Sequence, residues 1–326
     1  MNKTEELKAR LQTIVKQKGT YIDVFFIMKG DDGGVAKKAN IANGATDGLR
    51  KAHLDNIGQL VSMMEEDINS LTVINLSAAD DRKSAIYRYD LDDRPQFFDA
   101  FKEIEDHQYD DYFTKENGRF FVFSKDDLSQ IDAFVIHIGN DDNSLMIFRK
   151  NYSVNLFKRD RIYLIKESDT RFDTMKDDFI RLDAKIDFLY VNGEVYIYNL
   201  DVLERFGDFH QIITKEATAS LGEIGTLGLV SNLDVLSSRV DDLRFARKLA
   251  KISKDSPVFR VPQADIIDFT KKHPFLKDKF NYTADGSQIE LNTKLSQENF
   301  IKLLNDDFLR SELTKIDYES PAKNRL

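Results

Sequence analysis

The sequence has 326 residues, of which 41% are hydrophobic and 32% are charged, so it holds enough apolar material for a packed core and is not that of a disordered chain. It contains no cysteine, which excludes disulfides, thiolate catalysis and cysteine-ligated zinc or iron–sulfur sites, and agrees with a reducing cytoplasm. The longest strongly apolar run near the N-terminus, residues 24–28, is far shorter than the roughly 20 residues of a membrane span, so we expect a soluble, cytoplasmic protein.

The negative charge is concentrated in one segment. The formal net charge is −9, and residues 61–111 alone hold fourteen Asp and Glu against five Lys and Arg. Residues 239–280 hold eleven Lys and Arg against six Asp and Glu. Because local charge decides where a polyanion can bind, the acidic total does not exclude a basic surface in this second segment.

The first 125 residues predict a mixed α/β lobe. Apolar residues recur at helical spacing up to Gly19, and a strand is expected over residues 21–28. The Gly-rich segment 30–44 lacks the G-x-x-x-x-G-K-[ST] and G-x-G-x-x-G spacings, so we interpret it as a surface loop and not as a phosphate cradle. Further helices and strands alternate through the remainder of this lobe.

After residue 119 short apolar runs follow one another without a helix between them, which predicts an antiparallel meander. Its clearest hairpin joins two aromatic-rich runs at Asn192-Gly193. After Leu200 the pattern is helical, most clearly over residues 233–252. We therefore expect an α+β fold with an N-terminal α/β lobe, a central antiparallel β-meander and a C-terminal helical region, in two domains, 1–125 and 126–326.

No catalytic motif stands out. The five histidines have no metal-ligand spacing, and neither H-E-x-x-H nor G-x-S-x-G occurs. Asp187 and Glu194 flank the hairpin turn, but a two-residue turn pairs Val191 with Glu194 and leaves Asp187 at the opposite end. We predict that the hairpin is structural, and we expect no catalytic residue, metal or cofactor and favour a protein that is not an enzyme.

Two clusters of cations are candidate contacts for the phosphates of nucleic acid. The first recurs at offsets 0, 3, 4 and 7 of a predicted helix, on one arc of about 100° opposite to apolar residues. It consists of Arg244, Arg247, Lys248 and Lys251. The second follows the predicted strands and consists of Arg149, Lys150, Lys158, Arg159 and Arg161. Clustered cations are a footprint for phosphate, although an ordinary solvated surface shows the same pattern.

The segments around these clusters resemble a known family. LFKRDRIYLIKESDTRFD, FIRLDAKIDFLYVNGEVYIYNLDVLERFGDF and a helical tail that ends in SPAKNRL are similar to the KwaB family of the bacterial Kiwa anti-phage defence system, over roughly residues 130–326. The resemblance implies a cytoplasmic DNA-binding effector that forms a homodimer or higher oligomer. It also implies a membrane subunit, KwaA, that recruits the effector to the inner face of the membrane. It supplies no catalytic residues.

We therefore expect an anti-phage defence effector that binds double-stranded DNA without reading its sequence and hinders phage DNA replication or expression. Two alternatives stay open. The first is a metal-dependent nuclease of phage DNA, whose acids would converge only in the fold. The second is a non-catalytic scaffold of the defence complex, whose basic stripe would face KwaA or a second copy of the chain.

Overall fold

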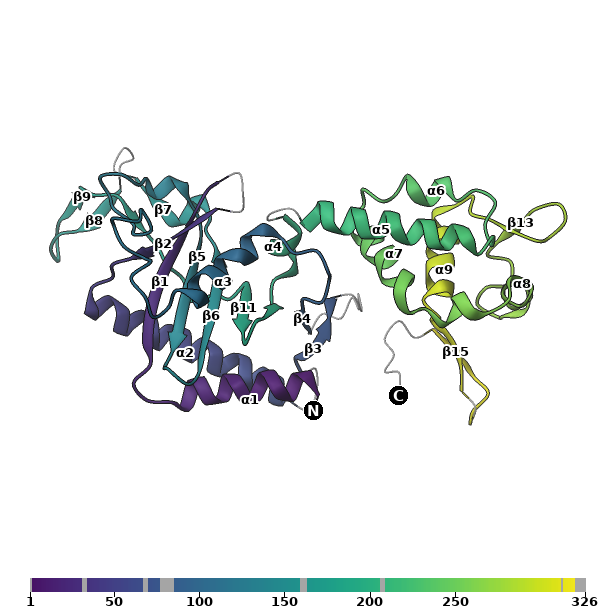
Figure 1. Cartoon of the computed structure of the whole chain (residues 1–326), viewed down its shortest axis with the longest axis horizontal. Coiled ribbons are helices and arrows are strands. Elements are labelled where there is room, and N and C mark those ends of the chain that lie inside the picture. The colour runs from purple at the N-terminus through teal and green to yellow at the C-terminus, as the bar shows by residue number, and fades with distance from the viewer. Residues whose placement is uncertain are drawn as a thin grey trace. The chain divides into compact units, whose positions relative to one another are not determined.

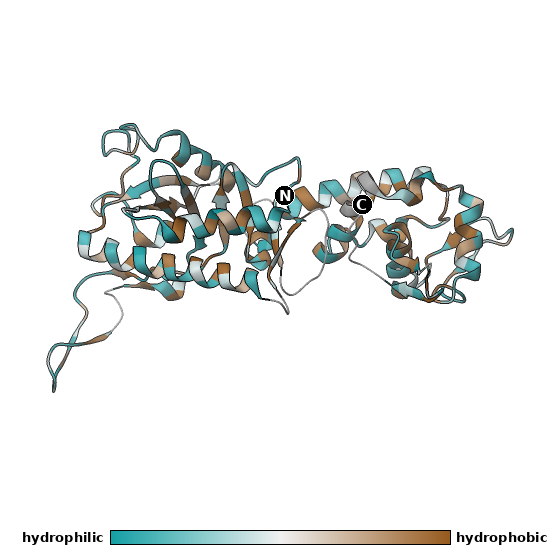
Figure 2. Cartoon of the chain, turned by 90° about the horizontal axis from the view of Figure 1, so that it is seen from below, coloured by the Kyte–Doolittle hydropathy of each residue, from teal (hydrophilic) through white to brown (hydrophobic). Residues whose placement is uncertain are grey.

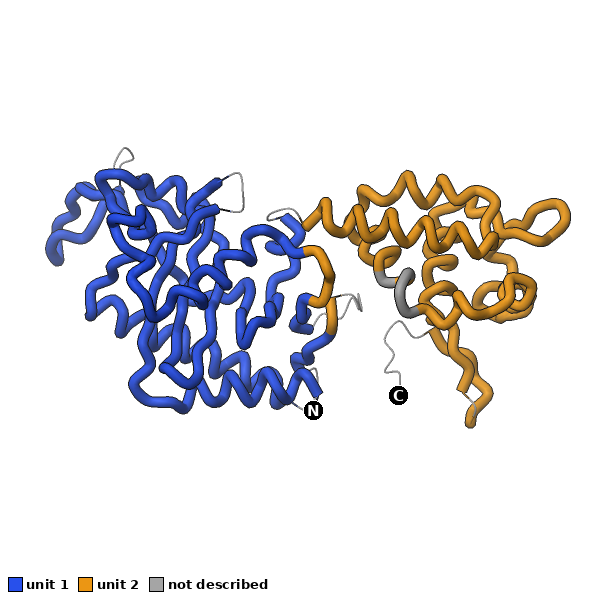
Figure 3. The backbone as a smooth tube through the Cα atoms, in the orientation of Figure 1, with its two compact units in different colours: residues 1–74, 83–89, 94–207 blue, residues 75–82, 90–93, 208–326 orange. Residues whose placement is uncertain are grey.

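Figure 1 shows the computed structural model of the chain, which describes residues 2–30, 34–66, 70–76, 85–158, 163–205, 209–311 and 313–319. The chain forms two compact units, which are distinguished in Figure 3. Unit 1 holds residues 1–74, 83–89 and 94–207, and unit 2 holds residues 75–82, 90–93 and 208–326. The predicted α+β class is confirmed, because unit 1 contains a large antiparallel sheet and unit 2 is mainly helical.

Unit 1 is built around one eight-stranded sheet with the strand order β2-β1-β5-β6-β11-β12-β4-β3. The strands are β1 (Tyr21–Met28), β2 (Val35–Ala39), β3 (Thr72–Asn75), β4 (Ala85–Arg88), β5 (Ile131–Gly139), β6 (Ser144–Lys150), β11 (Phe188–Val191) and β12 (Glu194–Ile197). The pairs with a described register are antiparallel. The predicted meander forms the middle of this sheet, and strands from the predicted N-terminal lobe extend both of its sides. The division of the chain into domains 1–125 and 126–326 stays a prediction.

Helices cover both faces of the sheet (Figure 1). They are α1 (Lys3–Lys16), α2 (Asn43–Glu65), the 3-10 helix η2 (Gln96–Phe98), α3 (Asp99–Asp106) and α4 (Leu200–Arg205). On one face, Leu11 of α1 and Ile57 of α2 share a core with Phe26 of β1. On the other face, Phe97 of η2 stacks on Phe188 of β11 with ring centroids 5.6 Å apart. Burial on both faces explains why the central strands are nearly continuous apolar runs.

The predicted hairpin is confirmed. Strands β11 and β12 meet at Asn192-Gly193, and Val191 pairs with Glu194. Both turn residues have positive φ, 53° for Asn192 and 78° for Gly193, which is the requirement of a type I′ turn. Between β6 and β11 the chain forms two smaller ribbons. These are β7 (Leu156–Phe157) with β10 (Phe179–Ile180) and β8 (Leu164–Lys166) with β9 (Phe172–Thr174).

Two local predictions were wrong. The Gly-rich segment is not all loop, because β2 pairs with β1. The backbone at Gly34 lies close to the end of β1, and only glycine fits there: at its φ of 89° an added Cβ would lie 2.5 Å from the Met28 carbonyl oxygen. The single helix expected over residues 233–252 is two helices, α6 (Asp234–Ser237) and α7 (Leu243–Asp255). Asp242 begins α7 as its N-cap by accepting hydrogen bonds from two amides of the first turn.

Unit 2 is a bundle of helices with two hairpins. Besides α6 and α7 it contains α5 (Phe209–Thr226), the 3-10 helix η5 (Pro257–Arg260), α8 (Gln263–Lys272), α9 (Lys294–Leu304), β13 (Asn281–Tyr282) with β14 (Ile289–Glu290), and β15 (Phe308–Arg310) with β16 (Asp317–Glu319). Its helices carry both hydrophilic and hydrophobic residues (Figure 2), as amphipathic helices around a core do. Within the described ranges, no helix has the length and apolarity to cross a membrane.

Candidate nucleic-acid interface

Helix α7 carries the predicted basic stripe on the side opposite to its core. Its apolar residues Phe245, Ala246, Leu249 and Ile252 are buried. Arg244 is exposed, and Arg247 and Lys248 are half-buried. The side chain of Lys251 lies outside the described part of the structure. Because the apolar face is packed, the cations of α7 can contact a polyanion without any loss of core packing.

An acid from another helix borders this stripe. Glu298 of α9 lies with Oε2 3.1 Å from Lys248 Nζ and with Oε1 2.9 Å from the guanidinium of Arg239. Burial acts to raise the pKa of Glu298, but hydrogen bonds from these two cations outweigh it and hold that pKa below its usual value. Glu298 is therefore ionised at neutral pH, and its negative charge compensates the positive charge of Lys248, which the sequence alone would count as free.

Arg244 differs from Lys248 in this respect. The backbone amide of Arg244 donates to the cap residue Asp242, while its side chain makes no ion pair with any residue that the structure describes. Its guanidinium is exposed at the N-terminal turn of α7. Arg244 is therefore the member of the stripe best suited to contact a phosphate directly.

The second predicted cluster is largely paired with acids inside unit 1. Arg149 is 8% exposed and bridges two aspartates, with Nε 2.8 Å from Asp183 Oδ1 and Nη1 3.0 Å from Asp187 Oδ1. The ammonium of Lys150 pairs with Asp132. Lys158 is half-buried, whereas Arg159 and Arg161 lie outside the described residues. Arg149 and Lys150 therefore offer little uncompensated charge to a phosphate.

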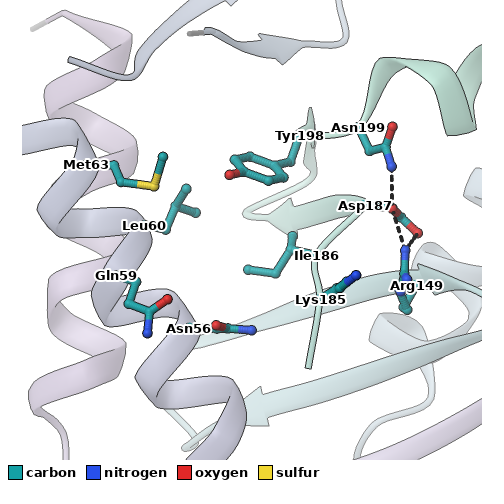
Figure 4. Close-up of a pocket in the computed structure, with 10 residues that line it drawn as sticks. All are labelled: Asn56, Gln59, Leu60, Met63, Arg149, Lys185, Ile186, Asp187, Tyr198 and Asn199. Atoms are coloured by element: carbon teal, nitrogen blue, oxygen red, sulfur yellow. Dashed lines mark hydrogen bonds and ion pairs between the residues drawn. The ribbon is translucent and has the colours of Figure 1, made fainter. Parts of the chain in front are cut away.

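Asp187 is fully buried and has a structural role in the sheet. Its carboxylate accepts hydrogen bonds from Arg149 Nη1 and from Asn199 Nδ2 (Figure 4). It also accepts one from the backbone amide of Lys150. Its backbone carbonyl accepts the amide of Tyr198 at 2.9 Å, so it joins β6, β11 and the end of β12. Glu194 lies at the other end of the hairpin, as predicted. The sequence did not indicate the buried ion pair, because its partners are 34 and 38 residues apart.

The acids that a metal-dependent nuclease would need do not gather in the described part of the chain. No group of three or more His, Asp or Glu side chains there could hold a metal ion. The nuclease therefore stays an alternative without a located site.

Two comparisons with known proteins identify the same family. The family model described as Kiwa protein KwaB-like matches residues 128–314, which include both basic clusters. The chain is 28% identical over 326 residues to the Kiwa protein KwaB of Escherichia coli O55:H7 (strain RM12579 / EPEC), a match that covers 99% of each chain. No solved structure matches.

Proposed function

This chain belongs to the Kiwa protein KwaB-like family, and from that premise we propose that it acts in anti-phage defence by binding double-stranded DNA without reading its sequence. The observation that supports DNA binding is the basic face of α7, where cations lie opposite a packed apolar face. Contacts from Lys and Arg to phosphate give affinity that does not depend on base sequence. Bound in this way, the chain would hinder phage DNA replication or expression.

The acidic balance of the chain is compatible with this proposal. The Debye length at physiological ionic strength is about 8 Å, so a phosphate at α7 responds mainly to charges in its immediate surroundings. Two acids lie next to the stripe: Glu298, which two cations already compensate, and Asp242, whose carboxylate accepts hydrogen bonds from the first amides of α7. Most of the acidic excess belongs to residues 61–111, in another part of the sequence.

We propose that the membrane subunit KwaA recruits the chain from the cytoplasm to the inner face of the membrane, and that the chain forms a homodimer or higher oligomer. Exposed apolar side chains on the β8–β9 hairpin support a protein contact, since Leu164 is 65% and Phe172 is 67% exposed. The same observation favours the scaffold alternative, in which protein contacts are the whole function. Fractionation of cells with and without KwaA tests the recruitment: the chain should enter the membrane fraction only when KwaA is present.

Charge reversal on α7 tests the DNA contact. Arg244→Glu with Lys248→Glu should weaken binding to unrelated duplexes alike, and it should flatten the salt dependence by about one unit for each phosphate that the variant no longer binds. Fluorescence anisotropy with labelled duplexes over a range of KCl concentrations measures both quantities. Lys16→Glu with Lys18→Glu is a matched control, because it makes the same change in net charge at exposed positions of unit 1.

The outcomes separate the three candidate functions. Unchanged affinity and salt slope in the α7 variant, or an equal loss in the control, would refute a phosphate contact by α7. Magnesium-dependent cutting of a linear duplex would favour the nuclease. The variant Leu164→Ser with Phe172→Ser could lose KwaA binding or self-association and keep its DNA affinity, and that result would be consistent with DNA binding by α7. If the wild-type chain does not bind DNA, the scaffold becomes the favoured function.

A further inference from the structure

Unit 1 contains an open pocket of about 320 Å³ that the proposed DNA contact does not use (Figure 4). One wall is a single stripe of helix α2, since its four lining residues recur at offsets 0, 3, 4 and 7. The opposite wall is formed where the chain enters β11 and leaves β12. The residues of α2 in the first wall are Asn56, Gln59, Leu60 and Met63, and all the lining residues are labelled in Figure 4.

Buried polar contacts hold the two walls in place. The carboxylate of Asp187 binds Arg149 and the side-chain amide of Asn199, which fixes the strand ends behind the pocket. Asn56 Nδ2 of α2 donates to the Ala184 carbonyl oxygen at 2.5 Å, which ties the helix to the opposite wall. Because these contacts come from the fold itself, the pocket is formed before any ligand arrives.

Several polar groups at this pocket are available to a ligand. Within the described part of the chain, no hydrogen bond or ion pair is made by the Lys185 ammonium, the Gln59 side-chain amide, the Asn56 side-chain oxygen or the Tyr198 hydroxyl. The ring of Tyr198 is partly exposed, and Leu60 and Met63 project from α2 toward it (Figure 4). The pocket thus combines an aromatic and apolar side, two amides and one unpaired cation.

We propose that this pocket binds one adenine nucleotide through its unpaired base and its phosphate. The face of a base stacks on aromatic side chains, and Asn or Gln amides match the donor and acceptor on the edge of adenine. Lys185 supplies the positive charge for the phosphate. Arg149 lies against both Asp187 and Asp183 and compensates one of their two charges, and Lys185 is the second cation of this group, so the phosphate would bind on the Lys185 side of the pocket. The volume lies at the lower end of the roughly 300–1,000 Å³ of small-molecule pockets, which suits a mononucleotide.

The nucleotide could be free in solution or could be an unpaired nucleotide of a DNA strand, since both present the same base and phosphate. The pocket belongs to unit 1 and the α7 face to unit 2, so this proposal does not rest on the DNA contact of α7. AMP and a short single strand of deoxyadenosines are therefore the two probes, and adenosine reports on the base without the phosphate.

Isothermal titration calorimetry of the full chain tests the proposal. Tyr198→Leu should weaken binding of the probe by roughly five- to a hundredfold, because the variant has no aromatic ring on which the base can stack. Lys185→Met should weaken AMP several-fold and leave adenosine unchanged. Lys16→Met, at an exposed lysine of the same unit outside the pocket, is the matched control and should bind like the wild type.

The probes identify the source of the nucleotide. Saturable binding of AMP that depends on Tyr198 supports a free nucleotide, and binding of the single strand alone with the same dependence supports a nucleotide within DNA. The proposal is overturned if neither probe gives saturable heat. It is equally overturned if Tyr198→Leu, with a wild-type melting curve, binds both probes as tightly as the wild-type chain.

Discussion

Replacing Glu298 with glutamine should strengthen DNA binding. In the native chain its carboxylate lies 3.1 Å from Lys248 Nζ and 2.9 Å from the guanidinium of Arg239. A phosphate that approached these cations would meet the negative charge of Glu298 at the same place. Glutamine keeps the size of the side chain and its hydrogen-bonding oxygen but removes that charge.

The higher affinity follows from the distances. A phosphate oxygen in contact with Lys248 at about 3 Å would lie about 6 Å from the Glu298 carboxylate. Two unit charges at about 6 Å repel each other by about 0.7 kcal/mol in bulk water and by about 2.8 kcal/mol at an effective dielectric constant of 20. The variant should therefore bind about 3- to 100-fold more tightly, and its salt slope should steepen by about one or two units.

Anisotropy titrations against salt measure both effects. Glu5→Gln is the matched control, because it also removes a carboxylate bound to a lysine, 2.7 Å from Lys8, but in unit 1. The control should bind DNA nearly as the wild type does. Stability should fall by less than about 1 kcal/mol for each broken pair, since Lys248 and Glu298 are both partly exposed. Equal or weaker DNA affinity in Glu298→Gln would refute the position assigned to the phosphate.

Three further predictions concern stability. Gly193→Val should lower the free energy of unfolding by about 1–2 kcal/mol in urea titrations, because the turn needs a left-handed residue at φ 78°. Asp187→Ala should lower it by about 3 kcal/mol, because Arg149 stays buried with one partner fewer, yet folded protein should keep its DNA affinity within a few-fold; lower affinity with a wild-type melting curve would contradict a structural role. Burial lowers the pKa of His53 and of His137 from 6.5 to about 4, so the unfolded chain binds protons that the native chain excludes. Stability should therefore fall as pH drops from 6.5 to 4, by about 1.4 kcal/mol per pH unit for each of these two histidines, and His53→Leu should reduce the slope by about that amount in urea titrations at several pH values.

The fold could be predicted where its signals are local. Strand β1 is an unbroken apolar run with the predicted bounds, and the β11–β12 hairpin follows from Asn192-Gly193. The joining of both into one sheet could not be predicted, because β1 pairs with β5 between residues more than a hundred positions apart, such as Tyr21 and Gly139. Strand β2 was missed because glycines such as Gly34 are typical of loops, and the sequence does not show that this glycine lies against the end of β1.

The candidate site shows the same division between local and tertiary information. The apolar and charged residues of α7 recur at helical spacing in the sequence, so its polar face could be predicted. The charges available on that face depend on other elements. Glu298 comes from α9, 50 residues beyond Lys248, and the partners of Arg149 come from the segment before β11. Cations that look alike in the sequence therefore differ in what they can bind.

This difference also separates the two proposed sites. Arg149 is occupied with Asp187 and Asp183, so the pocket beside it has Lys185 as its unpaired cation and suits one phosphate, whereas α7 presents several cations along a helix and suits a polyanion. Each site lies in its own unit, with its own core. Reversal of charge on α7 should consequently leave AMP binding at its wild-type value, and Tyr198→Leu should leave duplex affinity unchanged. A loss of both activities in either variant, with folding intact, would show that one surface serves both ligands and would contradict the independence of the two sites.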